Sequence, residues 1–145
     1  VLRLAESMKD DNVRFILIGV DDLTEEFSPN VIAMGRTENQ QELAEYYSMA
    51  DVFVICSAME NFPTTCLEAV CSGTPVAGFA AGGTAETAPA PVGRFTAPGD
   101  IAALRESVMA FLADPPAPEA FSPLRERFSG EQMYERYNAI YCEML

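Results

Sequence analysis

The feature that most constrains the fold of this chain is the alternation of short apolar runs with helical patterns. Runs rich in β-branched and aromatic residues occupy residues 13–19, 31–35, 52–56, 75–79 and 93–96. Because these runs are short and bounded by turn residues, they predict buried strands. Helical patterns are found at residues 2–8, 39–50, 64–71 and 101–112, with a helical turn at 81–86 and two closing helices after a proline-rich link at 114–118.

This alternation predicts the fold class. Strands that alternate with helices form a mostly parallel sheet with helices on both faces, joined by right-handed crossovers. We therefore predict a Rossmann-like α/β fold. A chain of 145 residues is close to the usual size of one domain, so residues 1–145 are predicted to form a single domain. Asp100 is the predicted N-cap of the helix at 101–112.

Charge and composition exclude several functions. The net charge is −13, whereas nucleic acids and anionic membrane surfaces need clustered Lys and Arg, so neither is an expected partner. No apolar run approaches the ~18 residues that span a bilayer. The chain lacks histidine, which excludes Ser-His-Asp and Cys-His nucleophile systems. The acid pairs at residues 10–11 and 21–22 are typical of solvated turns, so we predict no metal site and no cofactor.

Several cysteine and aromatic side chains are predicted to be packing residues. The cysteines lie in apolar or helical contexts without a CxxC pair, which indicates a reducing compartment and favours the cytoplasm. They are Cys56, Cys66, Cys71 and Cys142. Apolar residues of the last helices are expected to pack against neighbouring helices rather than to form a cofactor site, namely Phe111, Phe121, Met133, Tyr137 and Tyr141.

Two glutamates flank the turn between the third predicted strand and the helix that follows it. Glu60 precedes this helix and Glu68 lies within it. In open α/β sheets, ligands bind at such turns. Free N–H groups at the start of the helix, from Thr64, Thr65 and Cys66, would point at a bound anion, whereas Pro63 has no N–H to donate.

Each carboxylate also has a purely structural explanation. Thr65 and Glu68 fit the S/T-x-x-E capping box, in which Glu68 bonds back to the start of its own helix. A carboxylate has about four acceptor sites, so Glu68 could also accept hydrogen bonds from a ribose diol. Glu60 is either a solvated loop acid or a ligand-binding group.

A second candidate loop follows the fourth predicted strand. Gly82 and Gly83 permit positive φ angles and the close approach of a ligand to the backbone. Glu86 either orients this loop or contacts substrate, or it is simply a first-turn acid favoured by the helix dipole. The sequence leaves these alternatives open.

The motifs occur in a fixed order. Glu60-Asn61-Phe62-Pro63-x4-Glu68-Ala69-x2-Ser72-Gly73-Thr74-Pro75-Val76 precedes Gly82-Gly83-Thr84-Ala85-Glu86. This order resembles the donor-binding half of glycosyltransferase family 4, whose members are retaining enzymes of the two-domain GT-B architecture. The resemblance covers nearly the whole chain and extends to residues 15–19, 46–54, 98–100 and 128–141.

The resemblance implies roles for individual residues. In the family, the first glutamate of the pair contacts the donor sugar and the second binds the ribose, roles that carry over to Glu60 and Glu68. The sugar and diphosphate site would comprise Glu60, Asn61, Phe62, Pro63, Thr64 and Thr65. The nucleobase would lie near Gly19, Met34, Gly35 and Arg36, and the loop near the donor would contain Gly82, Gly83 and Glu86.

The resemblance also implies a reaction. It is the metal-independent transfer of a sugar from a nucleotide-diphosphate sugar to a glycan or lipid-linked acceptor, with the anomeric configuration retained. Capsule, lipopolysaccharide and exopolysaccharide synthesis in bacteria are the usual settings of the family. Two rival interpretations stay open, a GT-B-type epimerase or phosphorylase domain and a non-catalytic acidic interaction module.

The chain departs from the family pattern in two ways. Pro63 stands where the family commonly has glycine, which alters the local turn and its N–H donors. The family's diphosphate-binding arginine and lysine precede the position that matches Val1, and Lys9 is not their counterpart. The acceptor-binding N-terminal domain is also not represented. The resemblance therefore implies a fragment that binds nucleotide weakly and is inactive alone.

Overall fold

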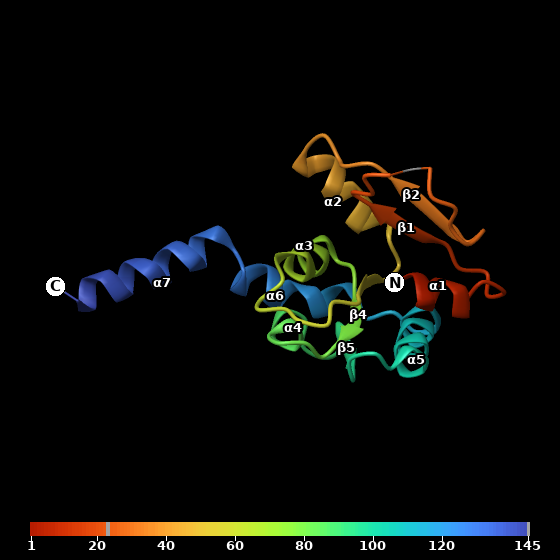
Figure 1. Ribbon diagram of the computed structural model, residues 1–145. Helices are drawn as coiled ribbons and strands as arrows, with labels where there is room; N and C mark the ends of the chain where they lie inside the picture. Colours follow the sequence, from red (N-terminus) through yellow and green to blue (C-terminus); the bar gives the residue numbers. More distant parts are fainter. Residues whose placement is uncertain (23, 145) are drawn as a thin grey trace.

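The structure is a computed structural model that describes residues 1–22 and 24–144, and strands and helices alternate along it (Figure 1). The strands are β1 (Phe15–Ile18), β2 (Val31–Met34), β3 (Phe53–Ile55), β4 (Val76–Phe79) and β5 (Gly93–Thr96). The helices are α1 (Leu2–Ser7), α2 (Gln40–Met49), α3 (Thr64–Ser72), α4 (Thr84–Thr87), α5 (Ile101–Ala113), the 3-10 helix η1 (Pro118–Phe121), α6 (Ser122–Arg127) and α7 (Gly130–Glu143).

All strand pairs of the described residues are parallel, which confirms the predicted α/β fold class. The prediction of one sheet is wrong, because the strands form two sheets, β1-β2 and β3-β4-β5. β1 and β3 each leave one edge unpaired, and a groove of about 730 Å³ lies between them. Periodicity identifies a buried strand but does not say which edges hydrogen-bond, so the sequence could not reveal this separation.

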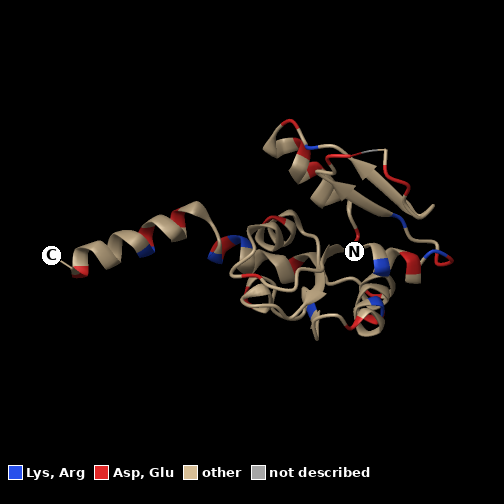
Figure 2. Ribbon diagram, viewed as in Figure 1, with Lys and Arg blue, Asp and Glu red and all other residues tan. Residues whose placement is uncertain are grey.

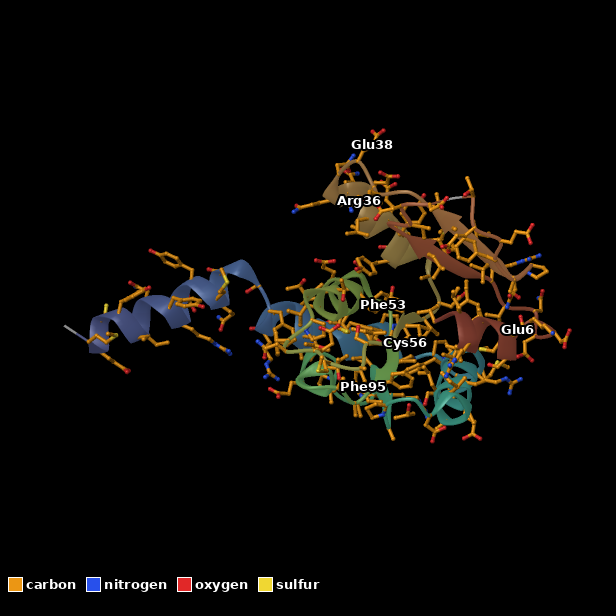
Figure 3. The ribbon with its side chains drawn as sticks, viewed as in Figure 1. Glu6, Arg36, Glu38, Phe53, Cys56 and Phe95 are labelled. Carbon is orange, nitrogen blue, oxygen red and sulfur yellow. The ribbon has the colours of Figure 1, made fainter. Side chains whose placement is uncertain are left out.

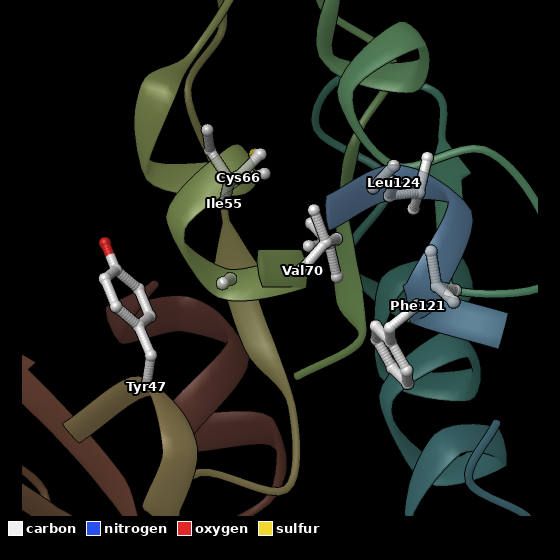
Figure 4. Packing of buried hydrophobic residues seen from close by; sticks show 10 residues of the cluster. Tyr47, Ile55, Cys66, Val70, Phe121 and Leu124 are labelled. Carbon is white, nitrogen blue, oxygen red and sulfur yellow. The ribbon is translucent and has the colours of Figure 1, made fainter. Parts of the chain in front are cut away.

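The core has two clusters of buried side chains, one on each side of the β3-β4-β5 sheet. The first joins α3 to η1 and α6, and Figure 4 shows Val70 on the side of α3 that faces Phe121 and Leu124, with Tyr47 on the other side. The second joins α1 and α5 to Phe15 of β1 and Phe79 of β4. Every residue of β4 is buried, as expected for the central strand of a sheet with two covered faces.

The ends of the helices explain where the chain turns. Asp100 caps α5 by accepting from the N–H of Ala103, as predicted. Asn39 caps α2 in the same way, by accepting from the N–H of Glu42. α3 ends at Gly73, whose φ of 93° is in the left-handed region where glycine is favoured. The turn from α3 into β4 therefore depends on this glycine.

The last helix departs from the rest of the chain. Phe111 and Phe121 are buried as predicted, but Met133, Tyr137 and Tyr141 are exposed, so the prediction that they pack against helices is wrong. Cys142 is also exposed, contrary to prediction, whereas Cys66 is buried. The reason is that α7 extends away from both sheets and contains no buried residue (Figure 1). Among the described helices, none combines the length and apolar character needed to cross a membrane.

Candidate functional site

Two loops meet at the carboxyl ends of the adjacent strands β3 and β4, where α/β folds bind ligands. The N–H of Gly83 donates to the carbonyl oxygen of Asn61 at 2.7 Å. A Cβ atom at Gly82 would overlap the carbonyl oxygen of Glu60, and one at Gly83 would overlap that of Asn61. The glycines were predicted to admit a ligand to the backbone. The structure places the backbone of Glu60 and Asn61 against them instead, so the two candidate loops form one unit.

A buried threonine, which the sequence interpretation missed, holds the second of these loops. The hydroxyl of Thr84 lies 3.0 Å from the carbonyl oxygens of both Phe79 and Ala81 and accepts a hydrogen bond from the N–H of Ala81. This side chain therefore ties the end of β4 to the start of α4. The only sequence signal was its position directly after the paired glycines.

At the start of α3, Thr64 and Thr65 are exposed, whereas Pro63 and Cys66 are buried. The helix begins at Thr64 with Pro63 as its N-cap, and no side chain bonds to the cap. The capping-box explanation of Thr65 and Glu68 is therefore wrong. Thr64 and Thr65 are exposed, and their N–H groups, which belong to the first turn, have no partner within the helix. The N–H of Cys66 was predicted to be free, but it donates to the carbonyl oxygen of Pro63 at 3.2 Å. This arrangement is suited to binding an anion.

Glu68 is held from outside its own helix. The hydroxyl of Tyr47 donates to Oε2 of Glu68 at 3.0 Å. Burial raises the pKa of Tyr47, and the hydrogen bond to Glu68 raises it further, so the phenol stays protonated as a donor. Tyr47 lies within the helical pattern at residues 39–50, but nothing local in the sequence links two residues on different helices, so this contact was not predicted.

The other residues of the first loop lie at the surface. Glu60 is partly exposed, and its side chain forms no hydrogen bond within residues 1–22 and 24–144. Asn61 is exposed, and Phe62 is 41% exposed with its ring edge-on to Phe128, the centroids 6.2 Å apart. Glu86 is exposed on α4. Of the predicted sugar and diphosphate residues, Pro63 is buried and Glu60 is partly exposed, while the other four are exposed around the start of α3.

The residues predicted to lie near a nucleobase form a separate group at the carboxyl ends of β1 and β2. The N–H of Gly19 donates to Gly35 at 3.1 Å, and the N–H of Val20 donates to Met34 at 2.9 Å. Arg36 forms an exposed ion pair with Asp21 at 3.4 Å. Figure 3 places Arg36 well away from Cys56, which follows β3. Within the described part of the chain, no hydrogen bond joins this group to the Glu60 loop.

The site is acidic and its carboxylates are not paired with cations. Figure 2 shows basic residues on α6, around α1 and on α5. The ion pairs of the described residues are Lys9–Glu6, Arg36–Asp21 and Arg105–Asp11, and none involves Glu60, Glu68 or Glu86. In the same residues, no three Asp, Glu, Cys or His side chains are grouped as a metal site. Any anion bound here would rely on the N–H groups and dipole of α3.

The fold of this chain is similar to that of a known enzyme. The chain is similar in structure to sucrose-phosphate synthase from Thermosynechococcus elongatus, with 27% sequence identity and a TM-score of 0.80. The match covers 97% of this chain but only 41% of the synthase chain. No curated protein matches the sequence significantly.

A family model described as Glycosyl transferases group 1 matches residues 1–129. The match ends just before α7, which starts at Gly130. It includes both loops of the site, the whole of α3 and both sheets. Because this match covers most of its length, the chain belongs to the Glycosyl transferases group 1 family.

Proposed function

We propose that this chain is the donor-binding domain of a retaining glycosyltransferase of family 4. The enzyme transfers a sugar from a nucleotide-diphosphate sugar to a glycan or lipid-linked acceptor without a metal ion. The observation that carries the proposal is membership of the Glycosyl transferases group 1 family over residues 1–129. The chain spans 41% of the similar synthase, so the acceptor and its binding domain are part of the proposal.

The geometry at the carboxyl ends of β3 and β4 supports a donor site there. Glu60 contacts the donor sugar, while Glu68 accepts hydrogen bonds from the ribose through the oxygen that Tyr47 leaves free. The exposed first turn of α3 offers the N–H groups of Thr64 and Thr65 to the diphosphate. The Gly82-Gly83 loop holds the backbone of Glu60 and Asn61 in place through the Gly83 N–H.

The charge of the chain limits how well it binds the diphosphate by itself. The net charge is −13, and the ion pairs of the described residues leave no cation beside the glutamates of the site. Negative charge on the leaving phosphates must be neutralised as the glycosidic bond breaks, which requires cations from another part of the enzyme. We therefore expect affinities for nucleoside diphosphates weaker than about 1 μM, which corresponds to roughly 8 kcal/mol.

The test is titration of the 145-residue chain with uridine, guanosine and adenosine diphosphates, observed by NMR at millimolar ligand. We expect one of the three to bind and the Glu68→Ala variant to bind it roughly tenfold more weakly, because a hydrogen bond to a charged group is lost. Glu106→Ala is the matched control, since Glu106 is an exposed helical glutamate on α5, outside the site. Failure of all three diphosphates to bind would contradict the proposal and favour a non-catalytic module.

The reaction itself is tested with the complete transferase that contains this sequence. NMR of the initial product should show the anomeric configuration of the donor, and turnover should continue when EDTA is present. An inverted product would contradict the retaining mechanism, and loss of turnover in EDTA would contradict metal independence. We place the enzyme in the synthesis of a bacterial capsule, lipopolysaccharide or exopolysaccharide in the cytoplasm, and identification of the acceptor would test this placement.

A further inference from the structure

We propose that Tyr47 is a positioning residue, which holds the carboxylate of Glu68 in the orientation that accepts the ribose hydroxyls. The inference rests on the proposed function, because it assumes that Glu68 faces the ribose. Tyr47 lies in α2, so the inference adds to the proposed donor site a residue from outside its two loops. The hydrogen bond from the Tyr47 hydroxyl to Oε2 of Glu68, 3.0 Å long, is the observation behind it.

The ring of Tyr47 is fixed before any ligand binds. It is only 8% exposed and belongs to the first core cluster. Its ring meets that of Phe53 edge-on, with centroids 5.4 Å apart and planes inclined by 73°. Figure 4 shows the side chain of Tyr47 extending from α2 with its hydroxyl at the far end. A rigid aromatic ring therefore presents a hydroxyl at a defined place beside α3.

The backbone of Tyr47 is fixed as well. Its carbonyl oxygen accepts a hydrogen bond from the buried hydroxyl of Thr74. The N–H of Thr74 in turn donates to the carbonyl oxygen of Ala69, in α3, at 2.9 Å. The end of α2 is thus attached to α3 both through the Thr74 turn and through the Tyr47–Glu68 hydrogen bond. The distance from Tyr47 to Glu68 is set by the fold rather than by a flexible loop.

Glu68 needs such a partner because nothing on its own helix restrains it. It is exposed on α3, and the capping box that would have held it is not formed. A free glutamate side chain loses rotamer entropy when it binds a ligand, and a hydrogen bond already formed removes part of that cost. With Oε2 occupied by Tyr47, Oε1 and the remaining lone pairs stay available to a diol.

The test compares Tyr47→Phe with Tyr46→Phe in the 145-residue chain. Phenylalanine keeps the ring and removes only the hydroxyl, while the neighbouring Tyr46 forms no side-chain hydrogen bond within the described residues and serves as the matched control. The readout is the ratio of affinities for a nucleoside diphosphate and for its 2′-deoxy and 3′-deoxy counterparts, because a merely structural effect would weaken all three alike. Uridine, guanosine and adenosine diphosphates are each titrated first. The deoxy counterparts are then those of the diphosphate that binds best.

We expect the unmodified chain and Tyr46→Phe to prefer the ribonucleotide by roughly tenfold, and Tyr47→Phe to lose most of this preference. Glu68→Ala should abolish the preference, and if it does not, the ribose assignment in the proposed function is wrong. If Glu68→Ala abolishes the preference but Tyr47→Phe retains it, the proposed function stands and the positioning role of Tyr47 is overturned.

A crystal structure of the unmodified chain with the same diphosphate tests the inference without a variant. Oε2 of Glu68 should stay within hydrogen-bond distance of the Tyr47 hydroxyl while the other oxygen contacts the ribose. A carboxylate that has turned away from Tyr47, with both oxygens on the ribose, would overturn the inference while supporting the ribose assignment.

Discussion

Gly83 shows how one small residue can determine the shape of the candidate site. Its φ is −86°, which any amino acid adopts, so its need for glycine comes from space and not from backbone strain. A Cβ atom here would overlap the carbonyl oxygen of Asn61, the same oxygen that accepts from the Gly83 N–H. The interface between the two loops therefore depends on the missing side chain.

We expect Gly83→Ala to lower the free energy of unfolding by about 1–3 kcal/mol, the usual cost of inserting a methyl group into a packed region. The measurement is urea denaturation. Gly130→Ala is the matched control, because nothing lies within 4 Å of a Cβ at Gly130 and the residue is at the start of α7. Alanine there should leave stability unchanged or raise it slightly. Equal effects of the two substitutions would show that the loops are not packed together in solution.

The strands β1 and β3 offer a sharper test of the arrangement of the sheets. The N–H of Phe15 bonds to Asn30 beside β2, and the N–H of Phe53 bonds to Pro75 beside β4. Successive residues of a strand point their N–H groups to opposite sides. The N–H groups of Ile16, Ile18 and Val54 therefore face the groove between the two sheets, which these residues line.

We expect the amides of Ile16, Ile18 and Val54 to exchange with deuterium much faster than those of Leu17 and Ala77. The N–H of Leu17 points toward β2, and Ala77 lies in the central strand β4. Both amides are therefore hydrogen-bonded within a sheet and serve as internal controls. The measurement is amide exchange followed by NMR. Slow exchange at all five amides would show instead that β1 and β3 pair in solution, in one sheet of order β2-β1-β3-β4-β5.

The positions of the strands were predicted from the sequence, but the pairing of the strands was not. Each strand, and each helix from α1 to α3 and α5, was predicted within a few residues, because the apolar period and caps such as Asp100 are local signals. The separation of the two sheets was not predicted, since it depends on contacts between distant segments. The hydrogen bond from Tyr47 to Glu68, 21 residues apart, was missed for the same reason.

The candidate site was predicted in part on the same grounds. The position of the Glu60 loop beside α3 follows from its place after a strand. The contact of Gly82 and Gly83 with the Glu60–Asn61 backbone does not follow from any local pattern. Apolar spacing in α7 identified a stripe of side chains, but spacing alone cannot say whether a neighbour covers it. Residues such as Tyr137 were therefore predicted to be packed and are exposed.

Across the molecule as a whole, buried side chains are distributed unevenly along the chain. The buried side chains of both core clusters lie at or before Leu124, and the family match ends at residue 129. Beyond it, α7 and its C-cap Met144 carry a stripe of exposed apolar side chains, namely Met133, Tyr134, Tyr137, Ile140, Tyr141 and Met144. In this chain, burial of apolar surface therefore stabilises the two sheets and their helices but contributes nothing to α7.

We expect Phe121→Ala to lower the free energy of unfolding by about 3–5 kcal/mol, because it removes a ring that is 2% exposed in the first cluster. Tyr141→Ala should change it by less than about 0.5 kcal/mol, because that ring is 63% exposed and no cavity is created. Both values come from urea denaturation, at a protein concentration varied tenfold. A large loss for Tyr141→Ala that grows with concentration would show that the exposed stripe is buried against a second copy of the chain, since association stabilises the folded state by mass action.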